Sequence, residues 1–267
     1  MIAASKRTDP AAPRDAVRSL RRRLRRLGWE FVDRRLESEQ RRGVLGPAHR
    51  RWRSNSAADN RDRWTHWDWT GGGEEWNASA PWKQALIDDV LIVWIPEDQV
   101  VLEIGPGAGR WSVVLQSRAR RLILVDVTER ALALCRERFA AADNVEYALS
   151  SGNDLPGIPD SSVDAIWSFD VFVHVAPVDQ AAYLAEVARV LTPGGVAVIH
   201  HADGRNLGNL PSRHGWRSPM SRNLFATLAA ECGLTVEAQI DSWGPDGCYD
   251  LSAYHDVITV CRKTPSA

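Results

Sequence analysis

The chain has 267 residues, of which 44% are hydrophobic and 25% charged, a balance typical of a globular protein that buries a real core. This length accommodates one large α/β domain with an appendage, or two small domains. The chain has no apolar run of about 18 residues and no apolar signal segment at its start, so neither a transmembrane helix nor secretion is predicted. Its four cysteines lie far apart, unlike the close pairs of zinc sites, and we expect a reduced, cytoplasmic protein.

Charge is distributed unevenly. Residues 1–53 hold 15 arginines and Lys6 against six acidic residues, so a net charge of +10 is joined to an acidic remainder. From Asp15 to about Arg42, apolar residues recur at steps of three and four between arginines, which predicts a basic amphipathic helix. We favour an interpretation in which its apolar stripe packs on the body or pairs with a second copy in a homodimer. Peripheral contact with anionic lipid is an alternative, and nucleic-acid contact is less favoured because a basic helix alone is a weak signal.

Residues 54–96 form a second segment, rich in tryptophan. The stretch RWTHWDWTGGGEEWNAS has three glycines and many polar residues, which favours a loop, yet it carries four tryptophans. Indole rings bury large areas, and their flat faces can lie against a sugar ring. We interpret the segment as a lid hinged at Gly71–Gly73, with plain packing as the alternative. An apolar helix is predicted at about residues 81–94, with Pro81 in its first turn.

Strand and helix patterns alternate in the third segment, residues 97–267. Strands are predicted at 100–105, 121–126, 145–148, 163–169 and 195–201, and helices at about 110–119, 129–141, 178–191 and 219–232. This alternation predicts a parallel sheet with both faces covered. Two final strands, 234–241 and 254–261, have no helix between them and predict a terminal antiparallel hairpin.

A glycine loop follows the first of these strands, in the stretch VVLEIGPGAGRW. Glycine lets the backbone turn sharply and approach a ligand closely. The dinucleotide fingerprint would place glycine where Arg110 stands, and Glu103 inside the strand is a further difference. Asp126 ends the next strand about twenty residues after the first glycine, where an acid can accept both ribose hydroxyls. Helix capping is the alternative for Asp126, although Thr128 suits that role better.

These features occur together with the stretches DLPGIPDSSVDAIWS, DVFVHV and VLTPGG. The combination resembles the class I S-adenosylmethionine-dependent methyltransferases over about residues 97–262. More narrowly, WSFDVFVHV, VIHHAD, GWRS and GEEWN are similar to stretches of actinobacterial enzymes that O-methylate sugars or polysaccharide ends. The resemblance implies a Rossmann-like, doubly wound α/β fold with seven strands in the order 3-2-1-4-5-7-6 and strand 7 antiparallel. It also implies S-adenosylmethionine as cofactor and S-adenosylhomocysteine as product.

The resemblance further implies where the cofactor binds. Glu103 supports the methionine end, Asp126 takes the ribose, and the segment after the third strand holds the adenine. Many family members have an acid for the adenine amine where this chain has Ser151, so its neighbours are expected to supply that contact. The expected cofactor-binding residues are Glu103, Gly105, Pro106, Gly107, Gly109, Arg110, Trp111, Asp126, Val127, Gly152, Asn153 and Asp170.

Methyl transfer to an alcohol also requires a proton acceptor, and a histidine fixed by a carboxylate suits that task. Asp170 and His174 follow the fourth strand, and the stretch GVAVIHHADG places His200, His201 and Asp203 at the end of the fifth. Because side chains alternate along a strand, His200 and His201 point to opposite faces. The predicted catalytic residues are Asp170, His174 and His201. The alternatives are a role at the rim of a helix for His174 and hydrogen-bonded support for the histidine pair.

A divalent metal at this edge is not favoured. In the ubiquinone-pathway O-methyltransferases, an acid-x-x-acid-His run here binds a metal ion, but Val173 replaces the second acid in this chain. A set of Asp170, His200, His201 and Asp203 is the remaining alternative. The expected substrate-binding residues are Trp67, Trp76, His200, Asp203, Trp216 and Arg217.

The sequence therefore predicts an O-methyltransferase whose acceptor is a carbohydrate or another polyhydroxylated small molecule. Three alternatives stay open. One is an N- or C-methyltransferase of small-molecule metabolism, another is an RNA methyltransferase that uses the basic helix, and the third is a cofactor-binding protein without turnover.

Overall fold

The computed structural model describes residues 55–203, 217–251 and 255–264. They belong to the larger of two compact units of the chain, Ser54–Ala267. The predicted basic helix and Trp216 lie outside the described residues. Within those residues, no helix is both long enough and apolar enough to cross a membrane.

A seven-stranded sheet occupies the centre of this unit, in the order β3-β2-β1-β4-β5-β9-β6. Neighbouring strands from β3 to β5 are parallel, and β9 is antiparallel to both β5 and β6. The predicted sheet, with its last strand inserted antiparallel between the fifth and the sixth, is therefore confirmed. The strands are β1 (Val100–Ile104), β2 (Arg121–Asp126), β3 (Val145–Leu149), β4 (Val163–Ser168), β5 (Leu191–Ala202), β6 (Leu234–Ile240) and β9 (Asp256–Lys263).

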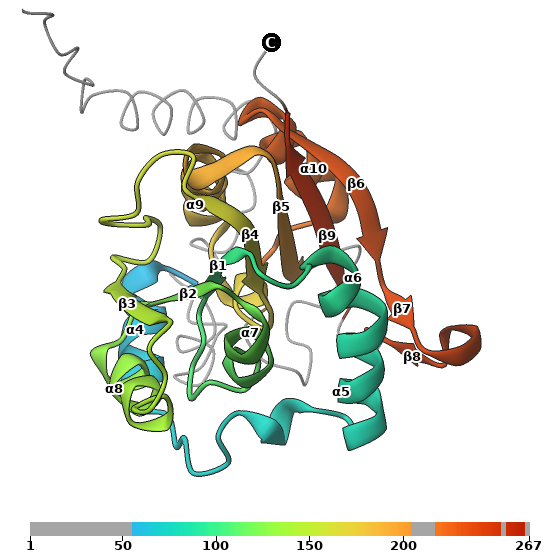
Figure 1. Cartoon of the computed structure of the whole chain (residues 1–267). Helices are drawn as coiled ribbons and strands as arrows, with labels where there is room; N and C mark the ends of the chain where they lie inside the picture. The colour runs from blue at the N-terminus through green and yellow to red at the C-terminus, as the bar shows by residue number, and fades with distance from the viewer. Residues whose placement is uncertain (1–54, 204–216, 252–254, 265–267) are drawn as a thin grey trace, which may run out of the picture. The chain divides into compact units, whose positions relative to one another are not determined.

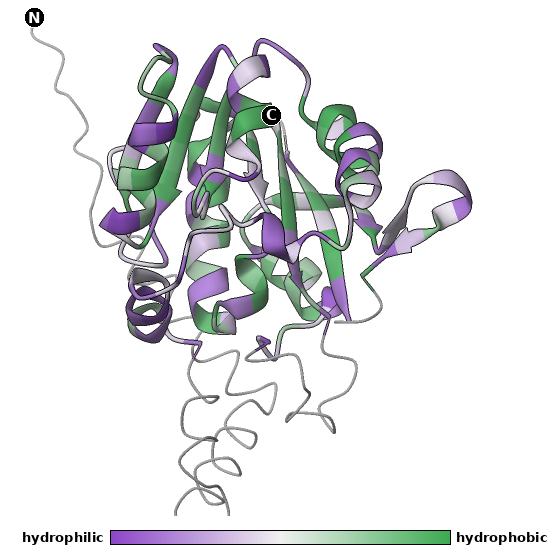
Figure 2. Cartoon of the chain, turned by 90° about the horizontal axis from the view of Figure 1, so that it is seen from below, coloured by the Kyte–Doolittle hydropathy of each residue, from purple (hydrophilic) through white to green (hydrophobic). Residues whose placement is uncertain are grey.

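Helices cover both faces of the sheet (Figure 1). One face packs in a single apolar core with α5 (Ala80–Leu86), α7 (Ser112–Arg118) and α8 (Glu129–Arg138). The other face carries α9 (Pro177–Val190) against β5 and α10 (Arg222–Glu231) against β6. Figure 2 shows the result, apolar strands enclosed between helices that turn polar surfaces outward. Helices are needed on both faces because the strands are apolar along nearly their whole length, so both faces of the sheet have to be buried.

Two regions differ from their predicted form. The apolar helix at 81–94 is broken into α5, a π-helical turn η2 (Ile87–Leu91) and α6 (Ile92–Trp94). The predicted link before the last strand contains a small ribbon of β7 (Ser242–Trp243) and β8 (Tyr249–Asp250) around η5 (Pro245–Gly247). Strands of two residues have no measurable alternation, so the sequence pattern did not reveal them.

The tryptophan-rich segment is also more ordered than the loop that its composition predicts. It contains α4 (Ala57–Thr65), capped by Ser56, and the short helix η1 (Glu74–Trp76). Asn60 is the buried residue of α4, so this helix has no apolar stripe that sequence periodicity could detect. Tertiary bonds hold it: Arg61 donates to the carbonyls of Val127 and Ser151, and Arg130 donates to that of Thr65. From α4 the chain passes the carboxyl ends of the central strands on its way to α5 (Figure 1).

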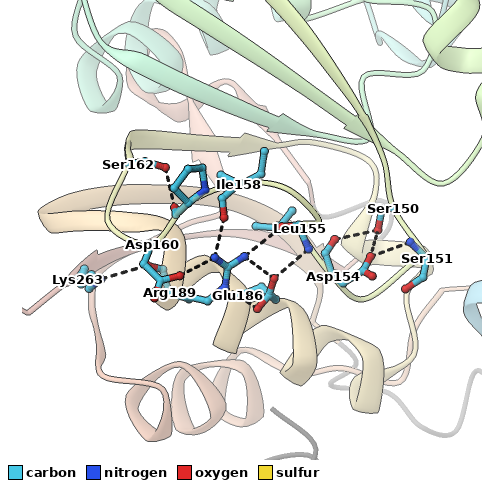
Figure 3. A network of polar contacts seen from close by, with 11 residues as sticks. Ser150, Ser151, Asp154, Leu155, Ile158, Asp160, Ser162, Glu186, Arg189 and Lys263 are labelled. Carbon is cyan, nitrogen blue, oxygen red and sulfur yellow. Dashed lines mark hydrogen bonds and ion pairs between the residues drawn. The ribbon is translucent and has the colours of Figure 1, made fainter. Parts of the chain in front are cut away.

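A polar network fixes the loop between β3 and β4 (Figure 3). Arg189 of α9 donates to the carbonyls of Ile158 and Leu155 at 2.7 and 3.0 Å, and it pairs with Glu186 and Asp160. Earlier in the same loop, Asp154 accepts hydrogen bonds from Ser150 and from the Ser151 backbone N–H. The network thus sets the path of the chain on either side of Gly152, which lines a cavity at this edge of the sheet.

Candidate active site

A cavity lies over the glycine loop that follows β1, and we call it the loop cavity. Its volume is about 80 Å³. Strands β1, β2 and β4 end beside it, and the segment of α4 and η1 covers it. It is lined by Ala57, Asn60, Trp64, Trp69, Gly73, Trp76, Ile104, Gly105, Pro106, Gly107, Ala108, Arg110, Trp111, Val125, Asp126, Val127, Gly152, Phe169, Asp170, Val171, His174, Val175 and Tyr183.

The glycines of the loop are required where they stand. Gly105, Gly107 and Gly109 have φ angles of 73°, 56° and 88°, which side chains rarely adopt. A Cβ on Gly107 would also lie 2.7 Å from the ring of Trp69. The bare backbone of Gly107 therefore lets a flat group pack directly on the loop, and in this structure that group is the Trp69 indole. Gly109 instead packs toward Arg138 of α8 and does not line the cavity.

Two buried carboxyl groups flank the loop. Asp126 accepts hydrogen bonds from the Thr128 backbone N–H at 2.9 Å and from the Gly107 N–H at 3.4 Å, and burial raises its pKa to about 6. The helix cap is Thr128, whose hydroxyl accepts from Ala131. Glu103 lies beneath the loop and accepts a hydrogen bond from Ser112 at 2.5 Å; burial raises its pKa to about 7. Asp126 thus reaches the cavity, whereas Glu103 is absent from its wall and is bonded to Ser112 of α7.

A row of alternating charges crosses the carboxyl edge of the sheet. Arg110 pairs with Asp170 at 2.6 Å, and an oxygen of Asp170 lies 3.2 Å from Nδ1 of His200. On the far side of the ring, Nε2 of His200 lies 3.4 Å from Asp256, which pairs with Arg217 at 2.9 Å. The charged row is therefore assembled from residues that follow β1 and β4 and from residues of β5 and β9.

The pKa shifts of the residues in this row depend on which charged groups are neighbours. Burial alone would raise the pKa of Asp170, but Arg110 and His200 hold it well below its usual range. Burial likewise opposes a charge on His200, yet Asp170 and Asp256 raise its pKa. Asp170 also has a positive φ of 61°, a strained backbone that persists where surrounding contacts over-determine it.

The two histidines of β5 point to opposite faces, as strand alternation requires. His200 stacks on Phe169 with ring centroids 4.2 Å apart and faces the charged row. His201 stacks on Phe225 of α10, and its Nε2 lies 2.7 Å from Oγ1 of Thr259; burial lowers its pKa to about 3. Asp203 shares that face and pairs with Arg222 at 2.6 Å. His201 and Asp203 line neither the loop cavity nor the one described next, so the predicted catalytic and substrate roles for them are not supported by their positions.

A second cavity adjoins the first, and we call it the tryptophan cavity. Its volume is about 690 Å³, within the range of roughly 300–1,000 Å³ common for ligand sites. It shares five wall residues with the loop cavity: Trp64, Trp76, Phe169, Asp170 and His174. The rest of its wall is Trp67, Glu75, Asn77, Ala78, Trp82, His200, Arg217, Cys248, Tyr249, Asp250, Leu251 and Asp256.

Most of the expected site residues meet at these two cavities. Of the expected cofactor residues, Glu103, Gly109 and Asn153 are absent from the wall of the loop cavity; the Asn153 side chain donates to Asp179. Trp67, Trp76, His200 and Arg217 line the tryptophan cavity. Sequence reasoning missed Asn60, Val171, Val175, Tyr183 and Asp256, because nothing local distinguishes them from packing residues. It had singled out Trp69 only as part of the tryptophan-rich segment. The part of the chain that the structure describes holds no group of three side chains arranged to bind a metal ion.

Comparison with known proteins agrees with this architecture. The model of a family described as a methyltransferase domain matches residues 101–195. Residues 101–195 form a methyltransferase domain. The chain is 39% identical over 162 residues to a Mycolicibacterium smegmatis protein described as a probable S-adenosylmethionine-dependent methyltransferase, which covers 58% of this chain and 59% of that relative. A Mycobacterium bovis protein provisionally named as an O-methyltransferase is 34% identical over 120 residues, 42% of this chain and 51% of the relative.

Solved structures extend the comparison to the fold. A S-adenosylmethionine-dependent methyltransferase from Aquifex aeolicus superposes with a TM-score of 0.56 at 19% identity, covering 74% of this chain and all of that one. The N-methyltransferase NodS from Bradyrhizobium japonicum gives 0.57 at 17% identity, covering 78% and 98%. The methyltransferase domain therefore has the class I methyltransferase fold. The chain spans less than two thirds of the length of the two curated relatives.

Proposed function

We propose that this protein transfers a methyl group from S-adenosylmethionine to a hydroxyl group of a carbohydrate or another polyhydroxylated acceptor. The observation that supports this proposal most directly is that the loop cavity and the tryptophan cavity share a wall, which includes Asp170 and His174. A donor in the first cavity and an acceptor in the second would meet across this wall. In-line displacement depends on such alignment, which can contribute about 7–11 kcal/mol to lowering the barrier.

The residues of the loop cavity fit the donor. Asp126 offers a carboxylate to the two ribose hydroxyls, the backbone beside Gly107 allows close approach, and Gly152 opens the wall after β3. When bound, S-adenosylmethionine supplies an electrophilic methyl group on a cationic sulfur. Among this chain's own residues, Asp170 lies in the wall shared with the tryptophan cavity and is paired there with Arg110, which lines the loop cavity.

A volume of about 80 Å³ is too small for this donor, since ligand pockets usually hold roughly 300–1,000 Å³. Trp64, Trp69 and Trp76 take up the outer part, with ring centroids 5.8–6.1 Å apart. In this proposal residues 66–79 are a lid, and the indoles of Trp69 and Trp76 leave the loop when the donor enters, while α4 keeps its bonds to the chain segments that follow β2 and β3. Gly72 and Gly73, both with positive φ, are its hinge.

His174 is the proposed proton acceptor because it lies in the shared wall, where the reacting hydroxyl would stand. Its short helix η3 (Phe172–His174) is held by Asn60 of α4, which donates to the His174 carbonyl at 2.8 Å. The imidazole of His174 would accept the proton that the acceptor hydroxyl loses as the methyl group is transferred from the donor to its oxygen. General-base catalysis of this kind contributes about 10²–10⁴-fold in rate.

The wall of the tryptophan cavity supports a hydroxylated acceptor. The indoles of Trp64, Trp67, Trp76 and Trp82 offer flat apolar faces, while Asp170, Asp250 and Asp256 offer hydrogen-bond acceptors. Sugars combine apolar C–H faces with many hydroxyl donors, so this mixture matches both properties. The O-methyltransferase name of one relative agrees with transfer to oxygen.

Calorimetry and mass spectrometry test the proposal. S-adenosylmethionine should bind to the whole protein, and a nicotinamide dinucleotide should not. Incubation with the donor and a panel of mono- and oligosaccharides should add the mass of one methylene to an acceptor. No donor binding, saturation by the dinucleotide, or transfer only to amines or RNA would refute this function.

A further inference from the structure

Asp256 is the first residue of β9 and pairs across the ladder with Ala202, at the end of β5. Its side chain is 0% exposed, yet it belongs to the wall of the tryptophan cavity. It does not line the loop cavity. Asp256 therefore faces the acceptor side alone, away from the wall at which methyl transfer is proposed.

The two oxygens of this carboxylate have different surroundings. Oδ2 lies 2.9 Å from a guanidinium nitrogen of Arg217 and 3.4 Å from Nε2 of His200. Neither oxygen has a hydrogen-bond partner among the described residues, and Oδ1 also lacks the ion-pair contacts that Oδ2 has. Folded proteins rarely leave a buried carboxylate oxygen unsatisfied, because the lost hydrogen bonds to water are not replaced. An oxygen of this kind in a cavity wall points to a donor group that a ligand brings.

The neighbours of Asp256 hold this orientation. His200 sits between Asp170 and Asp256, and its ring is fixed by stacking on Phe169. Arg217 approaches the same oxygen, Oδ2. With both Arg217 and His200 directed at Oδ2, Oδ1 is left without a partner among the described residues. His200 and Arg217 are therefore positioning residues, and they act on the acceptor through Asp256.

We infer that Asp256 binds the acceptor, with Oδ1 accepting a hydrogen bond from a hydroxyl group that is distant from the methylated oxygen. The inference rests on the proposed function for the role of the tryptophan cavity as acceptor site. Either a hydroxyl group or an ammonium group can donate this hydrogen bond. A neutral sugar and an amino sugar are therefore compared, to show which of the two groups Asp256 binds. Because the contact lies away from the reacting atoms, its loss should raise the KM for the acceptor and leave kcat nearly unchanged.

The experiment compares Asp256→Asn with wild type, using maltose as the neutral probe and glucosamine as the cationic one. Asp246→Asn is the matched control, since Asp246 is an exposed carboxylate that lines neither cavity. Calorimetry should show about tenfold or greater weakening for maltose in Asp256→Asn, as expected for a hydrogen bond to a charged acceptor. S-adenosylmethionine should bind both variants as it binds wild type, which also reports that they are folded.

Several results would overturn the inference. They are unchanged maltose binding by Asp256→Asn, an equal loss in Asp246→Asn, binding of glucosamine alone, or no binding of either probe to wild type. A fall in kcat at constant KM would also overturn it, since that is the signature of a catalytic group. If Asp256→Asn does not fold, His200→Gln replaces it and should weaken maltose binding through misplacement of Asp256, with donor binding intact. If wild type binds maltose through Asp256 but transfers no methyl group, the proposed function fails and the binding site remains.

Discussion

Asp126 should be unfavourable for stability and necessary for donor binding, and Asp126→Asn tests both expectations at once. Burial raises the pKa of this carboxyl group from 3.8 to about 6. At 1.36 kcal/mol per pKa unit, ionising it in the folded protein costs about 3 kcal/mol relative to the unfolded chain. The penalty is absent below pH 4, grows as the pH rises toward 6, and is complete above that value.

The asparagine avoids this penalty but does not reproduce every contact. Its carbonyl can still accept from Thr128, whereas the N–H of Gly107 loses its acceptor, at a cost of about 1 kcal/mol. The net stabilisation without donor should be about 1–2 kcal/mol at pH 8, which raises the Tm by roughly 2–8 °C. Donor affinity should fall at least tenfold, because a ribose hydroxyl loses a charged acceptor.

Thermal unfolding at pH 5 and pH 8, with calorimetry of S-adenosylmethionine binding, measures these effects. The gain in Tm should shrink at pH 5, where the wild-type carboxyl group is largely neutral. Asp143→Asn, which changes an exposed carboxylate, should alter neither quantity. A lower Tm for Asp126→Asn at pH 8, or a gain that does not depend on pH, would refute the reasoning from burial.

Three further variants probe other parts of the site. His174→Gln should reduce kcat by about 10²–10⁴-fold with donor binding intact, and single-turnover kinetics at saturating acceptor would expose an unaltered rate if His174 is not the base. Trp69→Ala should speed donor association measured by stopped flow, because the indole that packs on Gly107 no longer has to leave; an unchanged rate constant would argue against the lid. Arg189→Met should destabilise the protein by about 1–2 kcal/mol, since the carbonyls of Ile158 and Leu155 lose a donor, and an unchanged Tm would contradict that role.

The strands, the helices and the position of the glycine loop could be predicted because each depends on local signals, whereas the order of the strands in the sheet was implied by the resemblance to class I methyltransferases. Apolar runs of strand length separated by helical patterns specify a doubly wound sheet, and positive φ at Gly105 and Gly107 is a requirement that only glycine meets easily. Strand alternation also separated His200 from His201. It did not say which of the two would face the cavities, and the choice of His201 as catalytic is the prediction that the geometry does not support.

The limits of sequence reasoning are clearest for α4 and Asp256. Helix α4 has no apolar stripe, and its position depends on bonds from Arg61 and Arg130 to carbonyls far away in the chain. Asp256 begins an ordinary apolar strand, and it becomes notable only because β9 inserts beside β5 and brings it to His200.

The sequence by itself determined the helices and strands, their order along the chain and the glycine loop, because hydrophobic periodicity and backbone sterics act over a few residues. Only the tertiary structure decided which charges become neighbours, since the row from Arg110 to Arg217 is assembled from strands that are adjacent in the sheet and distant in the chain. Burial, which sets the pKa values of Asp126 and His201, is likewise a property of the packed molecule and not of any segment.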